Sequence, residues 1–168
     1  PASPVCVLVR DLSYSSGGFE TWVESLARHL PCQGIRVAVV VVGRGGTDGG
    51  DLDWACPDGC ECVRVGAVAA GSERDAVLAV LGDLAAGGAH GVFFCEGYDY
   101  INEVGACLAG GPWVPVSVLH ARHLSCYPHV WEDPNRVVVV PCRDFAWDVR
   151  TEIGQRWGVC SAWRRIRV

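Results

Sequence analysis

The sequence has no lysine and no methionine, so all 14 basic residues among its 168 are arginines. Chemistry that needs a lysine amine, such as a Walker-type phosphate loop or a Schiff base, is therefore excluded from this chain. A nucleic-acid interface needs a basic face, whereas the formal net charge here is −5. We therefore expect no nucleic-acid partner.

Long hydrophobic runs are also missing. The longest, VAVVVVG from Val37, has the length of a β-strand, and a membrane span needs about 18 apolar residues. The first residues show no charged-then-apolar leader. We expect a cytoplasmic protein whose ten cysteines are reduced, because a chain of this length builds a sufficient core without disulfides.

What the sequence does contain is a regular alternation of apolar runs and helical patterns. Runs rich in valine, isoleucine and leucine predict strands at 5–10, 36–42, 62–65, 91–95, 114–119, 136–140 and 165–168. Apolar residues at helical spacing predict helices at 19–30, 76–84, 101–108 and 144–157, the second of them capped by Ser72 and Asp75. The alternation predicts an α/β chain: one three-layer domain over residues 1–168 with a Rossmann-like, doubly wound, mostly parallel sheet.

Two glycines separate the first strand from the first helix, in YSSGGFETWV at residues 14–23. Ligands of such sheets bind outside the carboxyl ends of the strands, and the N-terminus of a helix favours an anion. Gly17 and Gly18 are therefore candidates for phosphate or acceptor binding, at positions where a Cβ would block a ligand or strain a positive φ angle. A plain tight turn explains both glycines equally well.

Three further residues are candidates because they follow predicted strands. His120 ends the strand in PVSVLH, where it could donate to a hydroxyl or phosphate oxygen and transfer a proton; a histidine satisfied within the fold is the alternative. Glu96 could accept hydrogen bonds from ligand hydroxyls, while Asp99 is expected to cap the following helix. Arg143 is a candidate for acceptor or phosphate binding by its location alone.

The cysteines of CPDGCEC, Cys56, Cys60 and Cys62, have the spacing C-x₃-C-x-C. Structural zinc sites use four ligands in paired knuckles, and no second pair follows. We expect no metal at these cysteines. The dinucleotide fingerprint G-x-G-x-x-G is also missing, since GRGGTDG at 43–49 lacks its third glycine.

Taken in order, these segments resemble the N-terminal domain of family 4-type retaining glycosyltransferases of GT-B architecture. SSGGFETWVESLARHLPCQGIRVAVVVVG is similar to the family's first Gly-Gly turn, helix and valine-rich strand, with matches at Gly17, Gly18, Glu20, Leu26, Ala27, Leu30, Gly34 and Val37. GGPWVPVSVLHAR, RVVVVPCRDFAWDVRTEIGQRWG and WRRIRV are similar to later segments of that domain. Cys142 stands where the family usually has serine.

The resemblance implies the acceptor-binding half of an enzyme that moves a sugar from a nucleoside-diphosphate sugar to an acceptor. It implies that the Gly17–Gly18 turn approaches the donor phosphates and the acceptor, that His120 lies near the reacting centre, and that no metal or cofactor is needed. The donor-binding domain is expected beyond Val168, so the isolated domain should be inactive. A lipid acceptor would bring peripheral membrane contact.

Two other functions stay open. A non-catalytic α/β module could keep this fold and bind a ligand or partner. An oxidoreductase domain is disfavoured by the missing glycine fingerprint.

Overall fold

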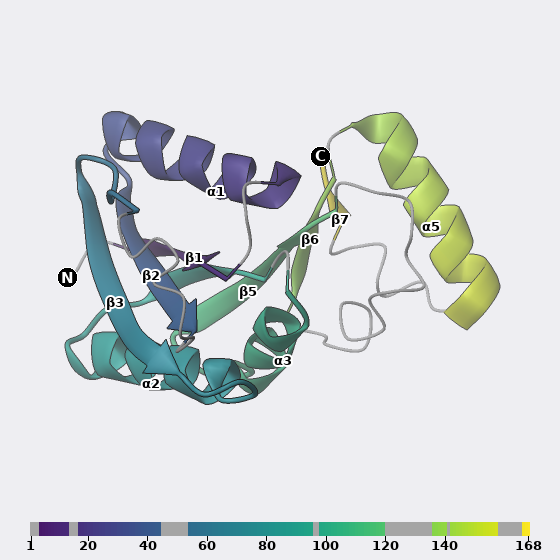
Figure 1. Cartoon of the computed structure of the whole chain (residues 1–168). Coiled ribbons are helices and arrows are strands. Elements are labelled where there is room, and N and C mark those ends of the chain that lie inside the picture. The colour runs from purple at the N-terminus through teal and green to yellow at the C-terminus, as the bar shows by residue number, and fades with distance from the viewer. Residues whose placement is uncertain are drawn as a thin grey trace.

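The computed structural model of the chain (Figure 1) describes residues 4–13, 17–44, 54–95, 98–119, 136–140, 142–157 and 166–168. In chain order the elements are β1 (Val5–Asp11), α1 (Gly18–His29), the 3₁₀ helix η1 (Pro31–Gln33), β2 (Arg36–Arg44), β3 (Cys60–Val68), α2 (Glu73–Ala86), β4 (Gly91–Phe94), α3 (Asp99–Cys107), β5 (Trp113–Val118), β6 (Val137–Val139), α5 (Arg143–Trp157) and β7 (Ile166–Arg167). Each predicted strand and helix has a counterpart, with ends that differ by a few residues.

The strands form one seven-stranded sheet in the order β3-β2-β1-β4-β5-β6-β7, and every neighbouring pair is parallel. This arrangement confirms the α/β, Rossmann-like doubly wound fold that the alternating sequence pattern predicts.

Helices cover both faces of the sheet, and the strand periodicity of two decides which residue faces which helix. On β1, Val7 and Val9 belong to the core shared with α2 and α3, whereas Cys6 and Leu8 belong to the core beneath α1. Figure 1 shows α1 on the opposite side of the sheet from α2 and α3. A third apolar cluster packs α5 against β6 and β7, through Phe145, Val149, Ile153, Val138 and Ile166 among others.

The strand order reverses at β1, which pairs with β2 on one side and with β4 on the other. The chain leaves β1 toward α1 on one face, and it leaves β4 toward α3 on the other. The two connections therefore diverge at the carboxyl ends of β1 and β4, which is where open α/β sheets form their ligand crevice. We call this place the switch point.

The helix caps differ from those expected. Ser72 occupies the N-cap position of α2, but its side chain makes no capping hydrogen bond. The carboxylate of Glu73 instead accepts a hydrogen bond of 2.7 Å from the Gly71 N–H. Asp99 is the first residue of α3 rather than its cap, and Tyr98 holds the N-cap position. The stretches described here contain no helix that is both long enough and apolar enough to cross a membrane.

Candidate functional site

Asp11, the last residue of β1, places a fully buried carboxylate at the switch point. Its Oδ1 accepts a hydrogen bond of 2.8 Å from the Ser13 N–H, and its Oδ2 accepts one of 3.1 Å from the Tyr100 hydroxyl. The Arg10 guanidinium donates to the Asp11 carbonyl at 2.8 Å. A buried carboxylate is costly unless it is hydrogen-bonded. These contacts offset that cost, and they also hold the chain in place where it leaves β1.

Glu20, in the first turn of α1, is the second buried carboxylate and is only 5% exposed. It accepts hydrogen bonds from the Gly17 N–H at 2.8 Å and from the Tyr98 hydroxyl at 2.6 Å. Burial alone would raise the pKa of Glu20, but the hydrogen bonds from Tyr98 and the backbone, with the charge of Arg10, hold it below its ordinary value. An ionised carboxylate therefore already lies at the positive end of the α1 dipole.

The two tyrosines lie at the start of α3, Tyr98 as its N-cap and Tyr100 in its first turn. Their rings stack with centroids 5.7 Å apart and planes 4° from parallel, and Phe19 meets Tyr98 edge-on at 5.3 Å. Burial, and then the neighbouring carboxylates, raise the pKa of both phenols. Both hydroxyls therefore stay protonated at neutral pH and act as donors. We name Asp11, Glu20, Tyr98 and Tyr100 the switch-point cluster. The cluster ties the N-terminal end of α3 to β1 and α1.

Gly17 and Gly18 differ in what surrounds the position that a side chain would occupy. Gly17 is the N-cap of α1 with φ −126° and ψ −172°, Gly18 begins the helix, and neither is among the glycines with positive φ. The expectation that a positive φ demands glycine here is therefore wrong. A Cβ on Gly17 would lie 2.7 Å from Glu20 Oε2, whereas a Cβ on Gly18 would meet nothing within 4 Å. Gly17 makes room for Glu20, while Gly18 faces open space.

A cavity of about 440 Å³ adjoins the switch-point cluster, within the usual size range for small-molecule sites. It opens between the N-terminal ends of α2 and α3, and its lining consists of Ala70, Gly71, Glu73, Arg74, Tyr98, Asp99, Tyr100 and Glu103.

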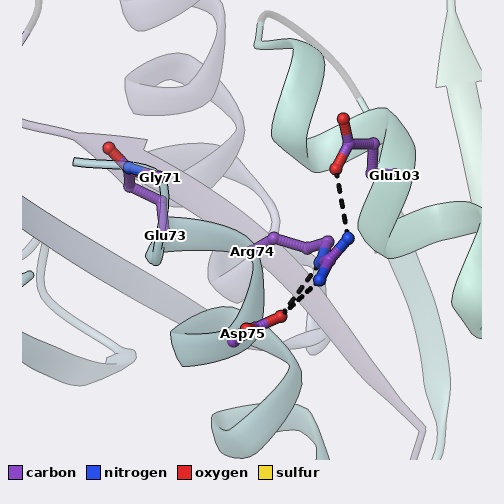
Figure 2. Close-up of polar contacts among 5 residues, drawn as sticks. All are labelled: Gly71, Glu73, Arg74, Asp75 and Glu103. Carbon is purple, nitrogen blue, oxygen red and sulfur yellow. Dashed lines mark hydrogen bonds and ion pairs between the residues drawn. The ribbon is translucent and has the colours of Figure 1, made fainter. Parts of the chain in front are cut away.

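The cavity lining carries more negative than positive groups. Figure 2 shows Arg74 between two carboxylates: its guanidinium lies 2.9 Å from Asp75 and 3.5 Å from Glu103. Glu73 is only 4% exposed, and its carboxylate accepts a hydrogen bond from the Gly71 N–H. With Glu73, Asp99 and Glu103 against a single arginine, the cavity suits a ligand rich in hydroxyl or amine donors better than a phosphate.

The structure brings only some of the predicted site residues together. Gly17 and Gly18 border the switch-point cluster, but Arg143 is an exposed residue that begins α5, after β6. Since β6 lies three strands from β1, Arg143 is separated from the glycine turn by roughly 14 Å of sheet. Glu96 and His120 fall outside the described residues.

Sequence reasoning missed Asp11, Glu73, Tyr98 and Tyr100. The available signals were an acidic residue closing an apolar strand, and two tyrosines flanking Asp99 in CEGYDY after the next inner strand. Among the residues that the structure describes, no three histidine, cysteine, aspartate or glutamate side chains form a group that could hold a metal ion.

Comparison with known proteins finds no protein-family model and no curated protein that matches the chain. Its function is therefore inferred from the fold and the site.

Proposed function

We propose that this chain is the N-terminal, acceptor-side domain of a retaining glycosyltransferase, which transfers a sugar from a nucleoside-diphosphate sugar. The observation that supports it best is a juxtaposition at the switch point. The open backbone at Gly18 and the cavity lined by carboxylates and tyrosines share one edge of the sheet. A transferase domain of this kind needs an acceptor pocket and, beside it, a stretch of backbone without side chains that the donor can approach.

The cavity would hold the acceptor. Glu103 offers carboxylate oxygens to hydroxyl or amine groups, and Tyr100 offers an aromatic ring to the apolar face of a sugar or cyclitol. The negative lining would keep the donor phosphates out of this cavity. The donor would then lie outside it, over Gly18, with most of its affinity supplied by a second domain beyond Val168. A lipid acceptor would leave its apolar part at a membrane surface.

The runner-up is a non-catalytic binding module, and one observation favours it. The Glu20 carboxylate occupies the N-terminal end of α1, where a phosphate would otherwise bind, and Tyr98 and Gly17 hold it there. In this reading the switch-point cluster only stabilises the fold. The two functions differ in whether Gly18 contributes to turnover.

A binding experiment separates the acceptor cavity from a purely structural role. The ¹⁵N-labelled chain would be titrated with neutral hexoses, amino sugars and nucleoside-diphosphate hexoses while backbone amide shifts are followed by NMR. We expect the neutral or amino sugars to shift Gly71, Tyr98 and Tyr100, and the donors to bind weakly. Tight donor binding to this chain, or no shift at those amides with any ligand, would contradict the proposal.

The coding sequence gives a second test. Beyond Val168 we expect an Asn-Gly-Val-Asp segment and, later, a Glu-x₇-Glu pattern in a donor-binding domain. In the complete protein, His120→Ala should reduce turnover by about 10²-fold if this histidine handles a proton or stabilises charge. A reading frame that ends at Val168 would favour the binding module.

A further inference from the structure

Three cysteines lie close together at the start of the edge strand β3, far from the switch point along the strands. Cys60 and Cys62 are two residues apart on β3, so their side chains share a face of the sheet. Both pack against the apolar cluster beneath α1. Cys56 lies in the segment just before the strand, and all three thiols are free and partly exposed.

Their thiols have different partners. The Cys60 thiol donates to the Ala27 carbonyl of α1 at 3.0 Å. The Cys56 thiol lies within interaction range of the Cys62 side chain, which, after burial, raises its pKa more than Cys60 does. Burial, and then this contact with Cys62, raise the pKa of Cys56 to about 12, so the Cys56 thiol stays protonated at neutral pH.

The segment that carries Cys56 is anchored at both ends. The Trp54 indole N–H donates to Glu24 of α1 at 3.3 Å, and the Arg64 guanidinium donates to the Trp54 carbonyl at 2.6 Å. Where β3 begins, the Cys60 N–H donates to the Pro57 carbonyl at 3.2 Å. The contact between Cys56 and Cys62 is thus held by its surroundings.

We propose that Cys56 and Cys62 form a thiol modification site, which small disulfides such as glutathione disulfide convert to an intramolecular disulfide. The Cys62 thiol loses its proton and attacks one sulfur of glutathione disulfide, which releases one glutathione. The Cys56 sulfur then loses its proton and attacks the Cys62 sulfur of this mixed disulfide, and the second glutathione leaves. Two protein thiols are oxidised and one glutathione disulfide is reduced to two glutathione molecules, which take up the two protons.

Cys60 is not part of the pair. Residues two apart on a strand are separated by about 6.6 Å with parallel side chains, which is near the limit for a disulfide. Its thiol is also directed to the Ala27 carbonyl of α1.

Mass spectrometry of the whole chain tests the pairing. After treatment with glutathione disulfide, free thiols are alkylated and the chain is cut at arginine, which places all three cysteines on the peptide 45–64. We expect that peptide to lose two hydrogens and to carry a single alkyl group, on Cys60. The exposed Cys107 and Cys142 serve as controls and should carry glutathione. Three alkyl groups on the peptide while Cys107 is fully modified would overturn the proposal.

Two variants complete the test. Cys60→Ser should still form the disulfide, whereas Cys56→Ser should retain a stable glutathione adduct on Cys62. The oxidised wild type should melt roughly 3–8 °C above its reduced form, and Cys56→Ser should show no such shift. A Cys60→Ser variant that no longer loses two hydrogens would assign the pairing to Cys60 and contradict the inference.

Discussion

At the scale of single residues, the two adjacent glycines have different reasons to be glycine. Gly17 lacks a side chain because the Glu20 carboxylate lies where its Cβ would point, and this carboxylate in turn accepts the Gly17 N–H. No part of the described chain comes near the Cβ position of Gly18. The described residues give no steric reason for glycine at position 18, and the proposed function assigns this position to the approach of a ligand.

The glycines should therefore respond differently to alanine. Gly18→Ala should leave the stability unchanged or raise it by up to about 1 kcal/mol, because alanine favours the helix. Gly17→Ala should cost about 1 kcal/mol or more, because Glu20 must move away from its hydrogen bond. Urea unfolding of both variants measures the difference. Equal destabilisation by the two substitutions would show that the turn needs both glycines for folding.

The bond between Tyr98 and Glu20 makes a pH-dependent prediction. Because the pKa of Glu20 is lowered in the folded state, the ionised carboxylate stabilises the fold above its ordinary value of 4.5, and this stabilisation is lost as the pH falls through the folded pKa. Tyr98→Phe should cost about 1.5–3 kcal/mol at pH 7 and clearly less near pH 3. Denaturant unfolding at the two pH values checks this.

Glu20→Gln is the matched control, because it removes the charge and keeps the shape. In that background, Tyr98→Phe should cost the same at both pH values. If the cost of Tyr98→Phe in the wild type does not fall with pH, the hydrogen bond is not made to an ionised carboxylate.

At the scale of elements, the first residue of β4 makes a close backbone contact with β1 at the amino ends of the two strands, opposite the switch point. Gly91 has φ +149°, and a Cβ there would collide with the backbone of Val5, its partner on β1. Gly91→Ala should therefore cost about 3 kcal/mol or more, through strain and loss of strand pairing. Gly110 is the control, because its φ is +76° but no atom lies near its Cβ position. Gly110→Ala should lower the free energy of unfolding by about 1 kcal/mol.

Thermal unfolding of both variants measures these costs. If Gly91→Ala and Gly110→Ala cause similar, small losses of stability, the close contact between β1 and β4 is not needed for stability.

Most elements could be predicted from the sequence, since inner parallel strands are continuous valine-rich runs and the helices show apolar faces. The start of β3 could not be found in this way. It begins at Cys60 in a segment that reads as polar, because an edge strand alternates: Cys60 and Cys62 face α1, while Glu61 is exposed. A search for unbroken apolar runs misses that alternation.

At the scale of the whole molecule, the site depends on contacts that sequence spacing does not reveal. Tyr98 meets Glu20 across 78 positions and Tyr100 meets Asp11 across 89. Both contacts exist because β4 pairs with β1. The order of strands in the sheet cannot be read from the sequence, so these contacts could not be predicted. The edge of the sheet was predictable from the fold class, but the residues that share its switch point were not.

The most direct test of the proposed function is sugar transfer by the protein that the complete reading frame encodes. Purified wild type and Gly18→Ala would be supplied with a panel of nucleoside-diphosphate hexoses and with neutral and amino-sugar acceptors, and products followed by mass spectrometry. We expect the wild type to transfer hexose, and Gly18→Ala to lose about 10²-fold in turnover with a melting temperature that is unchanged or slightly raised. No transfer from any donor, or an undiminished rate in Gly18→Ala, would contradict a ligand role for the switch point.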